Sequence, residues 1–159
     1  MNILFWSIAF AAGCAISVQA AVNSQLAGGL GGNTPAAALV SFAVGAVALG
    51  LIALSRGGMA AAIASLPSQP AWRFAGGVLG AAAIFSTVLL APRIGLANLL
   101  ALVIAGQLLS SLAIDHFGLV GAVVREVSPL KAAGAVVMMA GVFITLFSNA
   151  IAHAFQRAA

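Results

Sequence analysis

Five long apolar runs constrain the fold of this chain more than any other feature. Each covers about 20 mostly apolar residues, the length that an α-helix needs to cross the hydrocarbon core of a bilayer. We expect helices at about residues 3–22, 35–54, 72–91, 94–114 and 129–151. Only 5% of the 159 residues are charged, whereas soluble domains carry about a quarter. The sequence therefore predicts an all-α integral membrane protein, a bundle of five transmembrane helices that form a single domain over residues 1–159.

The first apolar run allows three interpretations. In the stretch "AAGCAISVQAAVNSQL", "AAGC" resembles the box before a lipoprotein cysteine and "VQA" resembles a signal-peptidase site. A secretory signal carries a positively charged start, however, and residues 1–21 contain no Lys or Arg. We therefore favour an uncleaved first helix, on which Gln19 and Asn23 share one face because they lie four residues apart.

Glycines and prolines predict where the helices end. After the first run, "AGGLGGNTP" indicates a break, with Thr34 as the expected N-cap of the second helix and Pro35 in its first turn. Pro92 is expected to end the third helix, with Gly95 near the start of the fourth. The connection over residues 55–71 is less polar than an ordinary loop, and we expect a short interfacial helix there.

Basic residues give a weak indication of orientation. Successive connections lie on alternating sides of the membrane. The N-terminus and the connections over 55–71 and 115–128, with their flanks, carry Arg56, Arg73, Arg125 and Lys131. The 27–34 connection, the Pro92 break and the tail carry Arg93 and Arg157. The positive-inside rule then places the N-terminus in the cytoplasm. A bias this small also permits insertion in both orientations. Arg93, in the Pro92 break, either attracts an anionic substrate or extends to the lipid phosphates.

Polar side chains inside the apolar runs are candidate binding residues, because such side chains usually face a bundle interior or a wet cavity. The amides of Gln19 and Asn23 either bind a substrate, link helices, or lie near the membrane interface. In the fourth run, Gln107, Ser111 and Asp115 form a polar stripe at four-residue spacing. Asn98 lies earlier on the same helix, rotated away from that stripe.

Asp115 allows two interpretations. It is either a helix-end carboxylate that pairs with a neighbouring cation or lipid headgroups, or a titrating group that couples proton movement to transport. His116 beside it either takes part in coupling or is structural.

The sequence lacks the residues that several classes of function require. "AGGLGGNT" has no lysine and follows no strand, so it is not a phosphate-binding loop. One cysteine, Cys14, and two distant histidines suggest neither a catalytic set nor a metal site. The six cations are scattered, which argues against nucleic acid as a partner. We therefore expect no enzyme activity, no cofactor and no metal.

The last run, "AAGAVVMMAGVFITLFSN", places Gly134 and Gly141 seven residues apart on one helix face. This pattern resembles the final helix of small multidrug resistance transporters, and the resemblance implies that these glycines pack two subunits together. More specifically, "SFAVG", "APRIG", "AGQLLSSLAIDHFGL" and the Gln-x3-Asn-x2-Leu pattern at Gln19, Asn23 and Leu26 resemble the YdcZ-like family. This family is a five-helix, half-length branch of the drug/metabolite transporter superfamily.

The resemblance implies a secondary transporter of small metabolites or drugs in the bacterial inner membrane. Full-length relatives have two inverted halves, so a half-length chain would form an antiparallel homodimer or pair with a paralogue. Its midplane cavity would be lined by helices one to four, with Gln19, Asn23, Asn98, Gln107 and Ser111 as wall residues. Small multidrug transporters carry a glutamate in helix one, and this chain has no acid there. Neutral or zwitterionic substrates therefore fit at least as well as cations. The alternative is a non-transporting membrane subunit of a larger complex.

Overall fold

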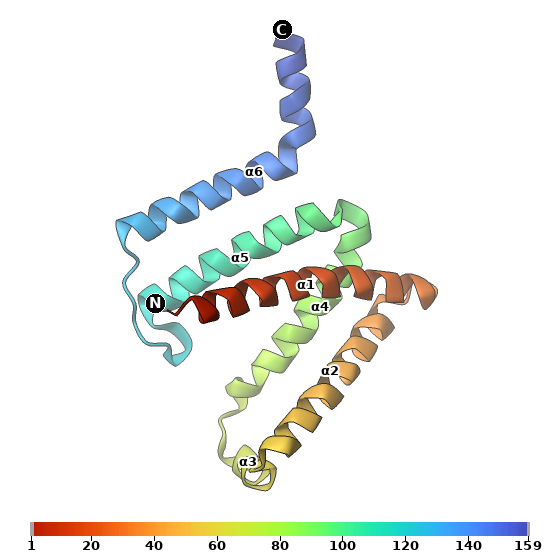
Figure 1. The fold of residues 1–159 in the computed structure, drawn as a ribbon, viewed down its shortest axis with the longest axis vertical. Coiled ribbons are helices and arrows are strands. Elements are labelled where there is room, and N and C mark those ends of the chain that lie inside the picture. Colours follow the sequence, from red (N-terminus) through yellow and green to blue (C-terminus); the bar gives the residue numbers. More distant parts are fainter. Residues whose placement is uncertain (1, 159) are drawn as a thin grey trace. The chain divides into compact units, whose positions relative to one another are not determined.

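Every regular element in residues 2–158, the part of the chain that the computed structural model describes, is helical. The order is α1 (Ile3–Gly29), α2 (Thr34–Arg56), α3 (Met59–Ser65), η1 (Leu66–Ser68), η2 (Ala71–Phe74), α4 (Ala75–Ile94), α5 (Leu96–Phe117), η3 (Leu119–Gly121) and α6 (Pro129–Ala158) (Figure 1). Five segments are long and apolar enough to cross a membrane: Ile3–Gly29, Thr34–Arg56, Ala71–Ile94, Leu96–Phe117 and Pro129–Arg157. The prediction of an all-α membrane protein with five spans is confirmed.

The break between α1 and α2 lies later than expected, because the helix continues through the first two glycines of the loop. α1 ends at Gly29, and the Leu30 N–H still donates to the Leu26 carbonyl at 3.0 Å.

The prediction that Thr34 caps α2 is wrong. Asn33 is the N-cap, and its Oδ1 accepts from the Ala36 N–H at 3.1 Å. Asn and Thr both favour this position, so sequence alone did not separate two adjacent candidates.

Pro92 does not end the third span, contrary to expectation. α4 continues through Pro92 to Ile94. A proline in the last turn removes only one helical hydrogen bond, and two further residues can follow it. The break comes at Gly95, whose φ of 80° and ψ of 148° form a conformation that residues with a side chain rarely adopt. The short helix expected in the 55–71 connection is present as α3.

The chain divides into two compact units, residues 1–93 and 94–159. In the first, α1 packs against α2, and α3 joins α2 to an antiparallel α4 (Figure 1). Its core is small: Ala27, Ala37 and Val88 come from α1, α2 and α4, with Leu26 and Ile84 packed against them. Small side chains let helix backbones approach closely where no hydrophobic effect drives association. This packing positions the cavities described below. The single domain over residues 1–159 stays a prediction.

In the second unit α5 packs along α6, on which the buried Ala135 and Val142 lie seven residues apart. The connection between the two helices is tied to the end of α5. The Arg125 N–H donates to the Asp115 carbonyl oxygen at 2.7 Å, and the Val127 N–H donates to His116 Nδ1 at 3.4 Å. The His116 ring also contacts Phe117 edge to face. These contacts favour the structural interpretation of His116.

Gly118 closes α5 and is expected to tolerate no side chain. Its φ of +62° lies in the left-handed region, and a Cβ there would lie 2.7 Å from Val124 Cγ2. Gly118→Ala therefore combines backbone strain of about 1–2 kcal/mol with a steric clash. Gly121→Ala is the control, because φ is +79° there but no atom lies within 4 Å of the added Cβ. Thermal unfolding in detergent should show the larger loss for Gly118→Ala, and equal losses would contradict the clash.

Candidate functional site

The amides of Gln19 and Asn23 lie one turn apart on α1 and differ in burial. Asn23 is 4% exposed and is the one polar residue among the buried described residues. Gln19 is exposed at the protein surface but borders a cavity. An amide in an apolar environment costs free energy unless it finds a hydrogen-bond partner. These two amides are therefore the first candidates for contact with a polar ligand.

Gln19 lines a cavity of about 260 Å³ between three helices, which we call the amide pocket. The residues of the amide pocket are Gln19 from α1, then Ser41, Phe42, Gly45, Ala46 and Leu49 from α2, and Ile84 from α4. Gly45 and Ala46 leave space because they have almost no side chain. The Gln19 amide and the Ser41 hydroxyl are the two side chains of the pocket that can donate and accept hydrogen bonds. The pocket can thus bind an uncharged polar group.

Asn23 lies one turn beyond the amide pocket, between the buried Ala20 and Ala27. The side chain of Asn23 makes no hydrogen bond to another described residue. Among the described residues, every side-chain nitrogen or oxygen that is fully shielded from solvent does have a hydrogen-bond partner. The small remaining exposure of Asn23 therefore includes both amide atoms. An amide enclosed in this way can still take a partner that reaches it.

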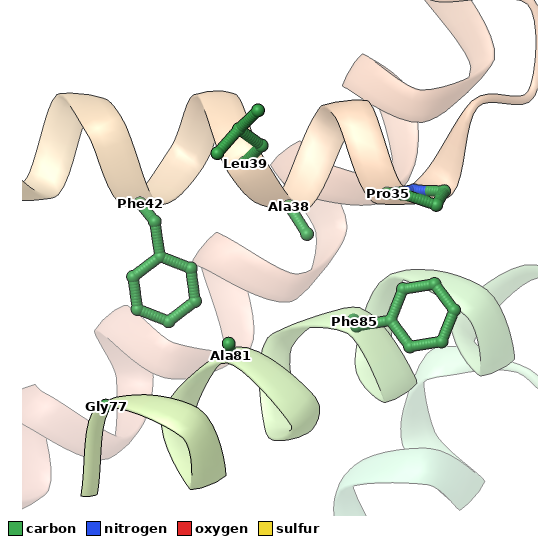
Figure 2. A pocket seen from close by; sticks show the side chains of 7 residues that line it. All are labelled: Pro35, Ala38, Leu39, Phe42, Gly77, Ala81 and Phe85. Atoms are coloured by element: carbon green, nitrogen blue, oxygen red, sulfur yellow. The ribbon is translucent and has the colours of Figure 1, made fainter. Parts of the chain in front are cut away.

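A second cavity, the apolar groove, has a volume of about 440 Å³ and lies between α2 and α4. It is lined by Pro35, Ala38, Leu39 and Phe42 from α2 and by Gly77, Ala81 and Phe85 from α4 (Figure 2). The Phe42 ring points from α2 toward α4 (Figure 2). A Cβ on Gly80 would lie 3.6 Å from this ring, an ordinary contact distance. An alanine at Gly80 would therefore fit against the ring without moving it.

A third cavity, of about 230 Å³, lies at the turn between α1 and α2. Ser24 and Thr34 contribute hydroxyl groups to its wall, and Arg93 from the end of α4 borders it. The Thr34 hydroxyl donates to the Gly32 carbonyl at 3.5 Å. Arg93 itself is exposed, as both of its predicted roles require.

The other predicted wall residues lie on α5, in the second unit. The Asn98 amide nitrogen donates to the Ile94 carbonyl of its own helix at 3.0 Å, and the Ser111 hydroxyl donates to the Leu108 carbonyl at 2.9 Å. Gln107 is exposed, and Asp115 is half-buried near the C-terminal end of α5. The structure thus brings Gln19 and Asn23 together on α1. The side chains of Asn98 and Ser111 each use part of their hydrogen-bonding capacity on a carbonyl of their own helix.

The two glycines of α6 are open on their outer side. A Cβ built on Gly134 or on Gly141 would meet no atom within 4 Å. The face of α6 that packs on α5 is instead the one bearing Ala135 and Val142. Within the second unit, Gly134 and Gly141 therefore lie on a face of α6 other than the one that packs on α5. Among the described residues, no group of three or more His, Cys, Asp or Glu side chains is placed to hold a metal ion.

Comparison with known protein families decides the class of the molecule. A family model described as "Putative inner membrane exporter, YdcZ" matches residues 4–144. The chain belongs to the YdcZ family. The matched segment begins in α1 and ends within α6, so all five spans contribute to it. Searches of curated proteins and of solved structures gave no match.

Membership of the YdcZ family, with five apolar helices, makes this protein a multi-pass inner-membrane transporter. The resemblance seen in the sequence motifs is confirmed. Family membership by itself identifies neither a substrate nor the residues that bind one. These must be argued from the cavities of this chain.

Sequence reasoning missed most of the residues that line the two larger cavities. Phe42, Gly77, Ala81 and Phe85 were not among the predicted site residues. Ser41 and Gly45 carried a signal, because small residues four apart mark a close helix contact. The aromatic side chains carried none, since apolar residues cover every face of a membrane helix.

Proposed function

We propose that this YdcZ-family protein is a secondary exporter of small uncharged or zwitterionic molecules, and that the amide pocket binds their polar group. The observation that carries the proposal is the Gln19 amide at a cavity between α1, α2 and α4, with the Ser41 hydroxyl in the same wall. Binding pockets for small molecules combine mostly apolar walls with a few polar groups that orient the ligand. The amide pocket has this composition.

The charge distribution supports an uncharged or zwitterionic substrate. The two acidic residues of the chain are Asp115 and Glu126, and both lie in the second unit. The helices that enclose the amide pocket thus have no carboxylate to neutralise a cation. A cationic substrate would have to lose its hydration there without a counter-charge, which is strongly unfavourable in a medium of low dielectric constant.

We further propose that the working unit is an antiparallel dimer, formed by two copies or by this chain and a paralogue. The open glycine face of α6 supports this, because small residues let a second helix approach closely in lipid. Two inverted copies can then alternate access by moving around a fixed site. The amides of Asn98 and Gln107 on α5 remain candidates for the wall of the transport cavity in the dimer.

Transport by the purified protein is the direct test. Proteoliposomes loaded with radiolabelled uncharged, zwitterionic and cationic metabolites should show saturable efflux of members of the first two classes. Empty liposomes give the background for passive leakage. If the purified protein moves none of the compounds and always co-purifies with a second membrane protein, it is a subunit of a larger complex and the exporter proposal fails.

Asp115 is the candidate coupling group. If its carboxyl group carries the driving proton, Asp115→Asn should reduce transport driven by a pH gradient at least tenfold. Substrate exchange without a gradient should continue, because the binding site is intact. Glu126→Gln is the matched control, since it neutralises the other acid of the chain. Unchanged gradient-driven transport in Asp115→Asn would leave the half-buried carboxylate with a structural role.

A further inference from the structure

The amide pocket and the apolar groove meet at one residue. Phe42 lines both cavities, and the neighbouring Ile84 and Phe85 of α4 line one each. Both cavities lie within the first unit of the chain. A molecule in the amide pocket therefore has the Phe42 ring as its boundary with the larger apolar space.

The apolar groove has the chemistry of a site for a hydrocarbon or aromatic group. None of its lining residues has a polar side chain. Gly77 and Ala81 leave room on α4, and Phe85 offers an aromatic ring on the same helix (Figure 2). Its volume of about 440 Å³ is in the range of small-molecule sites. The open groove can therefore accommodate a group the size of one or two aromatic rings.

We propose that the amide pocket and the apolar groove form one two-part site that takes an uncharged amphiphile. The polar head binds the Gln19 amide and the Ser41 hydroxyl, and the apolar body lies between α2 and α4. Phe42 is the specificity-determining residue between the two parts. This inference rests on the proposed export function and narrows its substrates to molecules with an amide-like or hydroxyl head and an apolar body.

The aromatic lining of the groove favours a small molecule over a helix from a second copy. Closely packed transmembrane helices meet through small residues, whereas two aromatic rings line this groove, Phe42 from α2 and Phe85 from α4. On α4 its lining residues run from Gly77 to Phe85, about 12 Å at the rise of an α-helix. The shared Phe42 places a polar pocket beside the groove, and this distinguishes the groove from a site for a lipid chain, because an acyl tail has no group for Gln19 or Ser41 to bind.

Photolabelling in lipid nanodiscs tests the inference. The probe is 3-(4-benzoylphenyl)propanamide, an uncharged molecule with an amide head and a benzophenone that inserts into nearby C–H bonds on illumination. We expect saturable labelling of α2 and α4 peptides that contain Leu39 or Phe85, competed by unlabelled 3-phenylpropanamide. Ala81→Phe fills the groove and should reduce this labelling at least fivefold. Ala82→Phe is the matched control, because Ala82 is exposed and does not line the groove.

The possible outcomes separate this inference from the proposed function. Three results would overturn the two-part site. They are no labelling of the wild type, labelling that excess competitor does not reduce, and labelling that Ala81→Phe leaves unchanged. Efflux from proteoliposomes would still stand in each case as evidence for export. If Ala81→Phe instead lowers the dimer fraction measured by cross-linking in the same nanodiscs, the groove is a subunit interface and the inference is wrong.

Discussion

Replacing Gln19 by leucine is expected to reduce saturable efflux at least fivefold while the protein stays folded. Leucine keeps a side chain of similar size on α1 but removes the amide from the wall of the amide pocket. The polar group of a substrate would then enter an apolar pocket with one fewer partner. A buried polar group without its partner costs about 1–3 kcal/mol. At about 1.4 kcal/mol for each factor of ten, this corresponds to roughly a 5- to 150-fold loss of affinity.

The chain offers a matched control for this substitution. Gln25 lies on the same helix, is exposed and lines none of the three cavities described above. Gln25→Leu makes the same chemical change and should leave efflux near the wild-type rate. Both variants should melt within a few degrees of the wild type in detergent. Equal efflux in the two variants would show that the Gln19 amide does not bind the transported molecule.

The class of fold could be predicted from the sequence because the bilayer imposes it. A chain with five runs of the required length and almost no charge can satisfy its backbone only as helices in a membrane. The exact ends of the helices were less predictable. Thr34 and Asn33 are both good caps, and Pro92 fits within the last turn of α4 as well as beyond its end. In each case the sequence offers local alternatives of similar energy and does not choose between them.

The candidate site could be predicted only in its polar part. Gln19 and Asn23 stand out because amides are rare and costly in apolar helices. Phe42 and Ala81 do not stand out, since apolar side chains face lipid, core and cavity alike. Their role follows from how α2 and α4 approach each other, which the hydrophobic pattern of a membrane helix does not encode.

Leucine at Gly141 is expected to disrupt the dimer and, with it, transport. A Cβ on Gly141 meets no atom within 4 Å, so the first atom of the new side chain has room there. In an antiparallel dimer packed through this face, four added carbon atoms would separate the two helix backbones. Loss of close van der Waals contact removes the main force that holds transmembrane helices together. We expect at least a tenfold fall in the dimer fraction, measured by cross-linking at low protein-to-lipid ratio, and a parallel fall in efflux.

Ala140→Leu separates a specific effect of this face from a general effect of larger side chains on α6. Ala140 is exposed and adjacent in sequence to Gly141, so its side chain lies about 100° around the helix. It should keep both dimer and transport. If Gly141→Leu loses transport but remains dimeric, the glycine face contributes to the transport cycle rather than to assembly. If Gly141→Leu keeps both the dimer and transport, the subunits associate through another surface. The resemblance of α6 to the last helix of small multidrug transporters then does not extend to the role of that helix in assembly.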